Sequence, residues 1–198
     1  MQNDASPLHE AVKDNQIALI KTLINSGVDL NAQDKAGDTP LHIAAQNGCV
    51  EVVQLLLAAG ANPDLTDKAD GYTPLHWAAY KGHAEVIKLL ASSADVNARE
   101  PFDEMTPLHL AAMEGQTEAV EVLLAAPQIK INAKNSYGNT AMHLAAGAGF
   151  ASVVQVLITA GAEPNIRNFE NTTPLSLAIL EGQSEVVRLL EAFSDIEE

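Results

Sequence analysis

Histidine is the residue whose spacing most suggests chemistry, because the chain holds six of them and imidazole is a common metal ligand. Five stand at intervals of 33 or 34 residues: His9, His42, His76, His109 and His143. A zinc site needs several nitrogens about 2.0 Å from one ion, whereas successive layers of packed helices lie roughly 8–10 Å apart. We therefore expect each ring to bond to the adjoining loop backbone, and we expect no metal and no cofactor.

A second chemical hypothesis rests on Cys49 and His83, which occupy equivalent positions 34 residues apart. Both stand near the expected start of a helix, where the pKa of a thiol can fall. The alternative function is therefore a Cys-His catalytic protein. Against it, no third orienting group, oxyanion pocket, glycine-rich phosphate loop or dinucleotide fingerprint accompanies the pair. We expect that the chain is not an enzyme.

These residues belong to a repeat that runs through the chain. The tetrapeptide Thr-Pro-Leu-His occurs intact at residues 39–42, 73–76 and 106–109. Looser copies stand at residues 6–9, 140–143 and 173–176, where Ala141 replaces proline and Ser176 replaces histidine. The six copies follow one another at steps of 33 or 34 residues. Self-similarity at this period predicts a stack of structural repeats.

Each copy predicts a helix, a turn and a second helix. Proline fits the first turn of a helix, and the threonine before it can cap that turn. An Ala-rich segment and a glycine follow, and then an apolar run such as residues 51–57. Because this run is apolar on nearly every side, it needs neighbours on both flanks. A polar turn and an Asp-x-x-Gly stretch end the copy, and Asn171 stands where Gly37 and Gly138 supply positive φ.

These motifs resemble the ankyrin repeat family over residues 6–190, nearly the whole chain. The resemblance implies an all-α fold, an ankyrin-repeat α-solenoid of six helix-turn-helix repeats with projecting β-hairpin fingers and a concave protein-binding face. The expected repeats span approximately residues 1–33, 34–66, 67–99, 100–133, 134–166 and 167–198. Repeat four departs from the pattern because its finger has no glycine.

The first and last copies differ from the others in a way that favours one complete domain over residues 1–198. Thr22 takes a position that is Leu or Val in the inner copies, and Glu191 takes one that holds Leu57. Terminal repeats of a solenoid need such polar outer faces. An acidic tail over residues 195–198 is expected to fray.

Composition limits the partners. The formal net charge of -15 and pI of about 4.6 disfavour phosphate backbones and anionic lipid surfaces, so we expect neither nucleic acid nor membrane binding. No apolar stretch is long enough to span a membrane. A single cysteine cannot form an internal disulfide, and the chain opens without a secretory leader, which predicts a cytoplasmic location.

If the repeated positions form the framework, partner contact falls where the copies differ. In the ankyrin family those positions are the finger tips and the two residues after the Ala-Ala pair. Five of the eight aromatic residues stand there, and exposed aromatic and methionine side chains are typical of binding hot spots. The alternative is that some rings pack on neighbouring fingers. The predicted partner-binding residues are Tyr72, Trp77, Tyr80, Lys81, Phe102, Met105, Met113, Tyr137, Phe169 and Leu180.

The sequence therefore predicts a monomeric protein-interaction module, an adaptor, inhibitor or targeting scaffold. Acids gather around the aromatic fingers at Asp64, Asp67, Asp70, Glu100, Asp103 and Glu104. They predict a partner protein with a basic or neutral surface that carries apolar anchors. Alternatives are a host-directed effector of an intracellular bacterium that acts by the same binding mode and a self-assembling structural protein. The resemblance also raises asparagine hydroxylation at Asn97 or Asn132.

Overall fold

The computed structural model describes residues 5–194, and the acidic tail and the first four residues lie outside this range. The described chain forms helices in six consecutive pairs. They are α1 (Pro7–Lys13), α2 (Ile17–Asn25), α3 (Pro40–Gln46), α4 (Val50–Ala58), α5 (Pro74–Lys81), α6 (Ala84–Leu90), α7 (Pro107–Met113), α8 (Thr117–Leu124), α9 (Ala141–Ala148), α10 (Ala151–Thr159), α11 (Pro174–Leu180) and α12 (Ser184–Ser194). The all-α solenoid predicted from the repeat is confirmed, with one pair in each predicted repeat.

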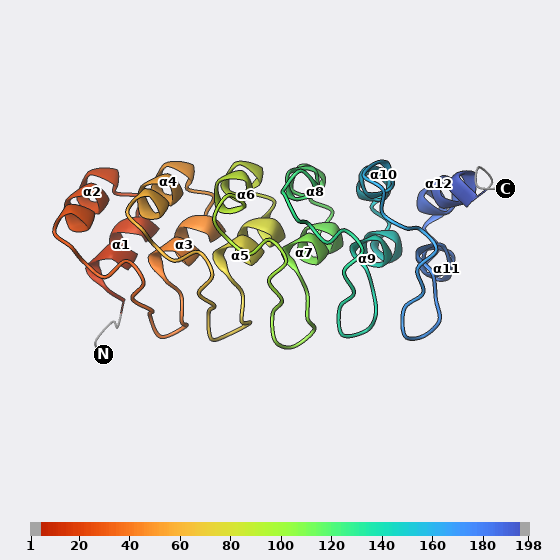
Figure 1. Cartoon of the computed structure of the whole chain (residues 1–198), viewed down its shortest axis with the longest axis horizontal. Helices are drawn as coiled ribbons and strands as arrows, with labels where there is room; N and C mark the ends of the chain where they lie inside the picture. The colour runs from red at the N-terminus through yellow and green to blue at the C-terminus, as the bar shows by residue number, and fades with distance from the viewer. Residues whose placement is uncertain (1–4, 195–198) are drawn as a thin grey trace.

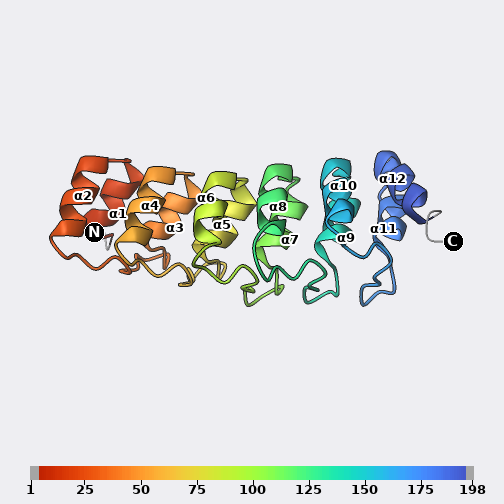
Figure 2. The same cartoon turned by 45° about the horizontal axis from the view of Figure 1, so that its top comes forward.

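The pairs stack side by side along one axis, with the termini at opposite ends (Figure 1). The odd-numbered helices form one row and the even-numbered helices a second row, while the loops between pairs project away from both. Figure 2 shows the same two rows from a tilted direction. Each odd-numbered helix contacts its own partner and the next odd-numbered helix, as α5 contacts α6 and α7. The loops and the odd-numbered helices together form one surface, here called the finger face.

The recurrent proline and threonine start the odd-numbered helices as expected. Pro74 occupies the first turn of α5, and the Thr73 hydroxyl accepts the backbone N–H of His76. A glycine with positive φ then turns the chain toward the second helix, as Gly82 does at φ +75°. The same start recurs in α3 and α7. Local sequence therefore determines where each pair begins.

The core runs through the stack as a repeating set of small and branched side chains. Leu75, Ala78 and Ala79 are fully buried on α5, and Ile87 and Leu90 are fully buried on α6. Alanine lets the odd-numbered helices approach closely, so the core fills with few aromatic side chains. At the last repeat, Ile179 takes the position of Ala79 and is 59% exposed.

The projecting loops, here called fingers, are not the β-hairpins that the resemblance implied. They span residues 34–38, 67–72, 100–105, 135–139 and 168–172, and no strand occurs within residues 5–194. The first residue of each finger pairs with the last through one backbone bond, as Asp34 N–H does with the Asp38 carbonyl at 3.0 Å. A side-chain oxygen of that first residue accepts hydrogen bonds from other backbone N–H groups of the same finger. Each finger therefore lacks the ladder of backbone hydrogen bonds that defines a β-hairpin.

Two fingers make their turn without glycine. Asn171 has φ +62°, which confirms the expectation that asparagine replaces glycine there. In the finger 100–105, Glu104 takes φ +54°, a conformation that is uncommon for a residue with a side chain. Its carboxylate forms an ion pair with Arg99 at 2.6 Å. Repeat four therefore keeps the finger turn although its sequence lacks the glycine.

Gly138→Ala is expected to destabilise the protein more than Gly161→Ala, although both glycines have positive φ, +77° and +87°. A Cβ at Gly138 would lie 2.8 Å from the Phe169 nitrogen, which donates a 3.1 Å hydrogen bond to Tyr137. At Gly161 a Cβ would meet no atom within 4 Å. We expect a loss of about 1–2 kcal/mol at Gly161 and roughly 2–4 kcal/mol at Gly138. Urea unfolding of both variants checks this, and equal losses would contradict it.

Candidate functional site

The repeated histidines join each repeat to the next. The Nδ1 of His76 accepts the backbone N–H of Thr73 at 3.2 Å, so its Nε2 carries the proton and donates to the Met105 carbonyl at 3.2 Å. The same two bonds recur at the other four positions, where the acceptor is the last residue of the following finger. The prediction that these rings bond to the loop backbone is confirmed.

Burial favours the neutral form of four of these rings, those of His42, His76, His109 and His143. It lowers the pKa of His76 and of His109 to about 4, and it also lowers the pKa of His42 and of His143. A proton on Nδ1 would also prevent this nitrogen from accepting the hydrogen bond of the threonine N–H. Within residues 5–194, no group of three histidine, cysteine or acidic side chains is arranged to hold a metal ion.

The geometry gives no support to a Cys49–His83 nucleophile. The sulfur of Cys49 faces the Asn47 carbonyl at 4.0 Å, and the Nε2 of His83 bonds to the Gln46 carbonyl at 3.0 Å. Burial raises the pKa of the Cys49 thiol, which is the opposite of the fall that a helix start could give. His83 therefore acts as a further link between repeats two and three.

The predicted contact residues of repeat three form one aromatic row. The rings of Tyr72 and Trp77 meet edge to face with centroids 5.2 Å apart, and Trp77 meets Tyr80 in the same way at 6.1 Å. The Trp77 Nε1 donates to Asp67 at 2.8 Å, and the Lys81 ammonium lies 5.0 Å from the centre of the Tyr80 ring. All three rings are partly exposed on the finger face, so a partner could contact them together.

The other predicted aromatic residues stand on the finger tips. Phe102 is 69% exposed and Tyr137 is 57% exposed, and the Tyr137 hydroxyl donates to Asp103 at 3.0 Å. Phe169 and Leu180 are also exposed, but they lie in the last repeat. The described contacts therefore link Tyr137 with the finger 100–105, whereas they leave Phe169 and Leu180 apart from it.

Met105 differs from the other predicted contact residues because it is buried, with 6% of its surface exposed. It is the last residue of its finger, where its carbonyl accepts from His76 and its sulfur contacts the Asn135 amide at 3.2 Å. These contacts turn the side chain inward, away from an exposed contact surface. Met113 is half-buried at the end of α7, as its position after the Ala-Ala pair suggests.

Two of the acids assigned to the binding surface have a structural role instead. Asp67 is 5% exposed and accepts the N–H groups of Asp70, Gly71 and Tyr72. Glu100 is 3% exposed and accepts those of Phe102, Asp103 and Met105. The first residues of the remaining fingers play the same part: Asp34, Asn135 and Asn168.

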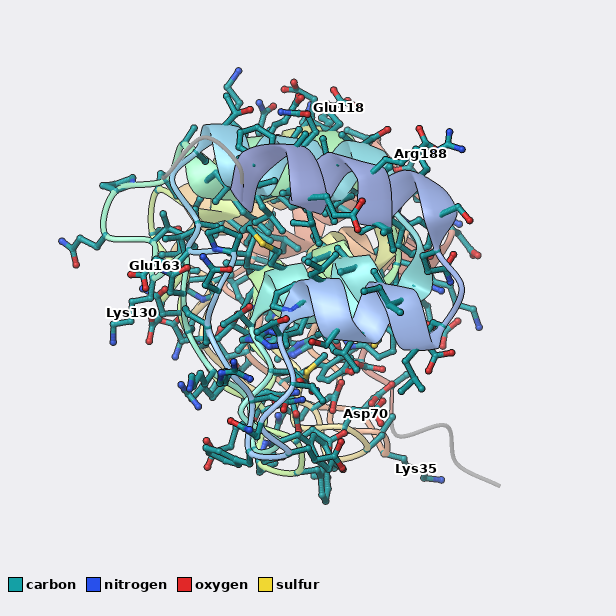
Figure 3. All side chains as sticks on the ribbon, turned by 90° about the vertical axis from the view of Figure 1, so that its right-hand side faces the viewer. Lys35, Asp70, Glu118, Lys130, Glu163 and Arg188 are labelled. Atoms are coloured by element: carbon teal, nitrogen blue, oxygen red, sulfur yellow. The ribbon has the colours of Figure 1, made fainter. Side chains whose placement is uncertain are left out.

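Of the six acids, Asp70 and Asp103 remain exposed on the finger face and form no ion pair among residues 5–194, while Asp103 accepts the Tyr137 hydroxyl. Glu104 pairs with Arg99, and Asp64 accepts the N–H of Asp95 in the turn that follows α4. Figure 3 shows Asp70 on the finger side, far from Glu118 on α8. In the finger 34–38, burial and then the charges of Asp34, Asp67 and other carboxylates raise the pKa of Asp38 to about 6.

Asn97 and Asn132, the residues considered for hydroxylation, bridge successive repeats. The Asn97 side chain accepts the Lys130 N–H at 2.8 Å and donates to the Gln128 carbonyl at 2.9 Å. Asn132 accepts the Glu163 N–H at 3.1 Å. These amides lie in the turns after the second helices, near the side where Figure 3 labels Lys130 and Glu163. They therefore serve the framework of the stack.

Two cavities differ in their chemistry. One of about 270 Å³ lies on the finger face and is lined by Asp70, Tyr72, Glu100, Phe102, Asp103, Met105, Leu110 and Met113. A larger one of about 480 Å³ lies between α6 and α8, where Ala91 stands in place of Leu57 and Leu124. The larger cavity is mostly apolar, and it reflects this loss of side-chain volume. The smaller cavity collects the predicted aromatic and acidic residues, so it is the better candidate site.

No helix within residues 5–194 combines the length and the hydrophobicity that crossing a membrane requires.

The family described as Ankyrin repeats (3 copies) matches residues 8–100, 51–135, 92–168 and 127–197. The nuclear factor NF-kappa-B p105 subunit of Gallus gallus is 34% identical over 175 residues, which cover 86% of this chain and 18% of that protein. The inactive serine/threonine-protein kinase TEX14 of Bos taurus is 39% identical over 69 residues, 34% of this chain and 5% of the relative. The E3 ubiquitin-protein ligase KEG of Arabidopsis thaliana is 45% identical over 60 residues, which cover 30% of this chain and 4% of that protein. The chain thus spans less than a fifth of each relative.

Proposed function

Because this chain belongs to the ankyrin repeat family, whose repeats are generally protein-protein interaction modules, we propose that it binds a partner protein on its finger face. The observation that carries the proposal is the aromatic row of Tyr72, Trp77 and Tyr80 beside the exposed ring of Phe102. Partly exposed aromatic side chains give large contact area with little loss of side-chain entropy. The module acts by occupancy, as an adaptor, inhibitor or targeting scaffold.

The partner presents a basic or neutral surface with apolar anchors. The net charge of -15 and the exposed carboxylates of Asp70 and Asp103 favour such a surface over an acidic one. The apolar anchors pack on Tyr80, Phe102 and Met113. Binding by a monomer in the cytoplasm fits the single thiol of Cys49, which a reducing compartment leaves unpaired.

The combined variant Tyr80→Ala, Phe102→Ala, Tyr137→Ala is expected to lose its partner in affinity capture from native lysate. Removing three aromatic anchors costs about 1 kcal/mol or more each, so recovery falls at least tenfold. The matched control replaces three exposed residues of the even-numbered helices by alanine: Gln54, Glu121 and Gln155. This control should recover the partner normally.

Capture in rising salt adds a second test, because screening weakens the attraction between exposed charges. Recovery should fall as salt increases. Equal recovery by the finger-face variant and the wild type would place the binding surface elsewhere. A response that does not change with salt would contradict the basic partner.

A further inference from the structure

The cavity on the finger face lies between the finger 67–72 and the finger 100–105. Asp70 and Tyr72 come from the first, and Phe102 and Asp103 come from the second. Met113 contributes from the end of α7. A volume of about 270 Å³ suits one large side chain. The site is therefore a slot between neighbouring fingers.

A single residue distinguishes the two fingers that line the slot from the other neighbouring fingers. Neighbouring fingers are elsewhere joined by a backbone bond from the second residue of one finger to the finger before it: Lys68 to Ala36, Ser136 to Asp103 and Phe169 to Tyr137. In the finger 100–105 the second residue is Pro101, which has no N–H to donate. The fingers 67–72 and 100–105 therefore lack this bond, and Gly71 packs against the Pro101 ring instead.

The walls of the slot combine rings, apolar side chains and negative charge. Tyr72 and Phe102 supply rings, and Leu110 and Met113 supply apolar surface. The carboxylates of Asp70 and Asp103 form no ion pair with a lysine or arginine within residues 5–194. Burial, followed by Asp70, Glu100 and other acidic groups, raises the pKa of Tyr72 to about 12, which agrees with a negative potential in the slot.

Among side chains, arginine fits this combination best. Its planar guanidinium can stack on an aromatic ring while its N–H groups donate to carboxylates, and its methylene stem packs on apolar walls. A lysine ammonium is a compact, strongly hydrated charge that gains less from two flat rings. An apolar side chain would give Asp70 no partner and would leave Asp103 with the Tyr137 hydroxyl alone.

We propose that the slot between Tyr72 and Phe102 binds one arginine side chain of the partner protein, with its guanidinium held by Asp70 and Asp103. The inference rests on the proposed function, because it specifies how a basic partner anchors itself on the finger face. It assigns specificity to the pair of fingers that Pro101 leaves without the backbone bond found between the other neighbouring fingers.

Methionine methyl groups provide a direct test. With methyl-labelled methionine, the NMR spectrum of the wild type reports on Met105 and Met113 at the slot, while Met142, buried in repeat five, serves as an internal control. The probe is the peptide acetyl-Gly-Gly-Arg-Gly-Gly-amide, and its control replaces arginine by citrulline, which has nearly the same shape without the charge. The arginine peptide should shift Met113 with a dissociation constant on the order of 1 mM, whereas Met142 stays unchanged.

Paired variants separate this site from the overall negative charge. Asp70→Asn with Asp103→Asn should weaken the arginine peptide at least about fivefold. The control, Glu118→Gln with Glu121→Gln, removes the same charge from exposed positions of α8 and should leave the affinity within about a factor of two. Titration of Met113 measures both.

The outcomes distinguish the inference from the proposed function. Equal shifts from the arginine and citrulline peptides, no Met113 shift, or equal losses from the two paired variants would each overturn the arginine slot. If the partner is still lost from the variant at Tyr80, Phe102 and Tyr137, the proposed function survives such a result. If that variant captures its partner normally, the proposed function fails whatever the peptide does.

Discussion

Acidification from neutral pH to about 4 is expected to destabilise the stack by about 3 kcal/mol for each of His76 and His109. Burial lowers the pKa of both rings from 6.5 to about 4 in the folded protein. Below pH 6.5 these histidines therefore bind protons in the unfolded chain but stay unprotonated in the folded chain. The free energy of unfolding falls until the pH reaches the folded pKa. His42 and His143 shift in the same direction and add to the loss.

Urea unfolding followed by far-ultraviolet circular dichroism at several pH values measures this loss. Asp38 has the opposite effect, because its folded pKa of about 6 lies above the ordinary value of 3.8. Its carboxylate is unfavourable at neutral pH, and this cost declines as pH falls from about 6 to 3.8. Asp38→Asn should therefore be more stable at neutral pH and show a steeper acid loss. Constant stability between pH 6.5 and about 4 would refute the role assigned to the buried rings.

His109→Ala is expected to lower the free energy of unfolding by about 3–5 kcal/mol. The fully enclosed ring accepts the Thr106 N–H at 3.1 Å, contacts the Thr106 hydroxyl at 2.8 Å and donates to the Asn139 carbonyl at 3.1 Å. Alanine leaves these polar groups buried without partners and creates a cavity between repeats four and five. Both effects act in the middle of the stack, where every layer depends on its neighbours.

Ser176→Ala is the matched control, because Ser176 holds the histidine position in repeat six. It is exposed and bonds locally to Thr173 at 2.9 Å. The expected change is within about 0.5 kcal/mol. Urea midpoints of the two variants provide the measurement, with circular dichroism of the native state to confirm helix content. If both substitutions cost the same, the histidine links do not stabilise the stack.

Several features of the candidate site could not be predicted from residue type and position alone. Residue type and position put Met105 on the surface with Phe102, although it ends its finger and turns inward. The same reasoning makes Asp67 and Glu100 surface charges, whereas they close their own fingers. A signal for the latter did exist: an acid or asparagine stands first in all five fingers. An oxygen repeated at one position indicates a shared structural role.

The sequence by itself determined the order, period and pairing of the helices, the links made by the repeated histidines and the turn at Asn171. It could do so because each repeat contacts mainly its neighbours, so every layer carries the same local requirements. Only the tertiary structure decided which side chains remain exposed and where a slot opens. Those features arise from single departures such as Pro101, whose effect depends on the finger that lies beside it.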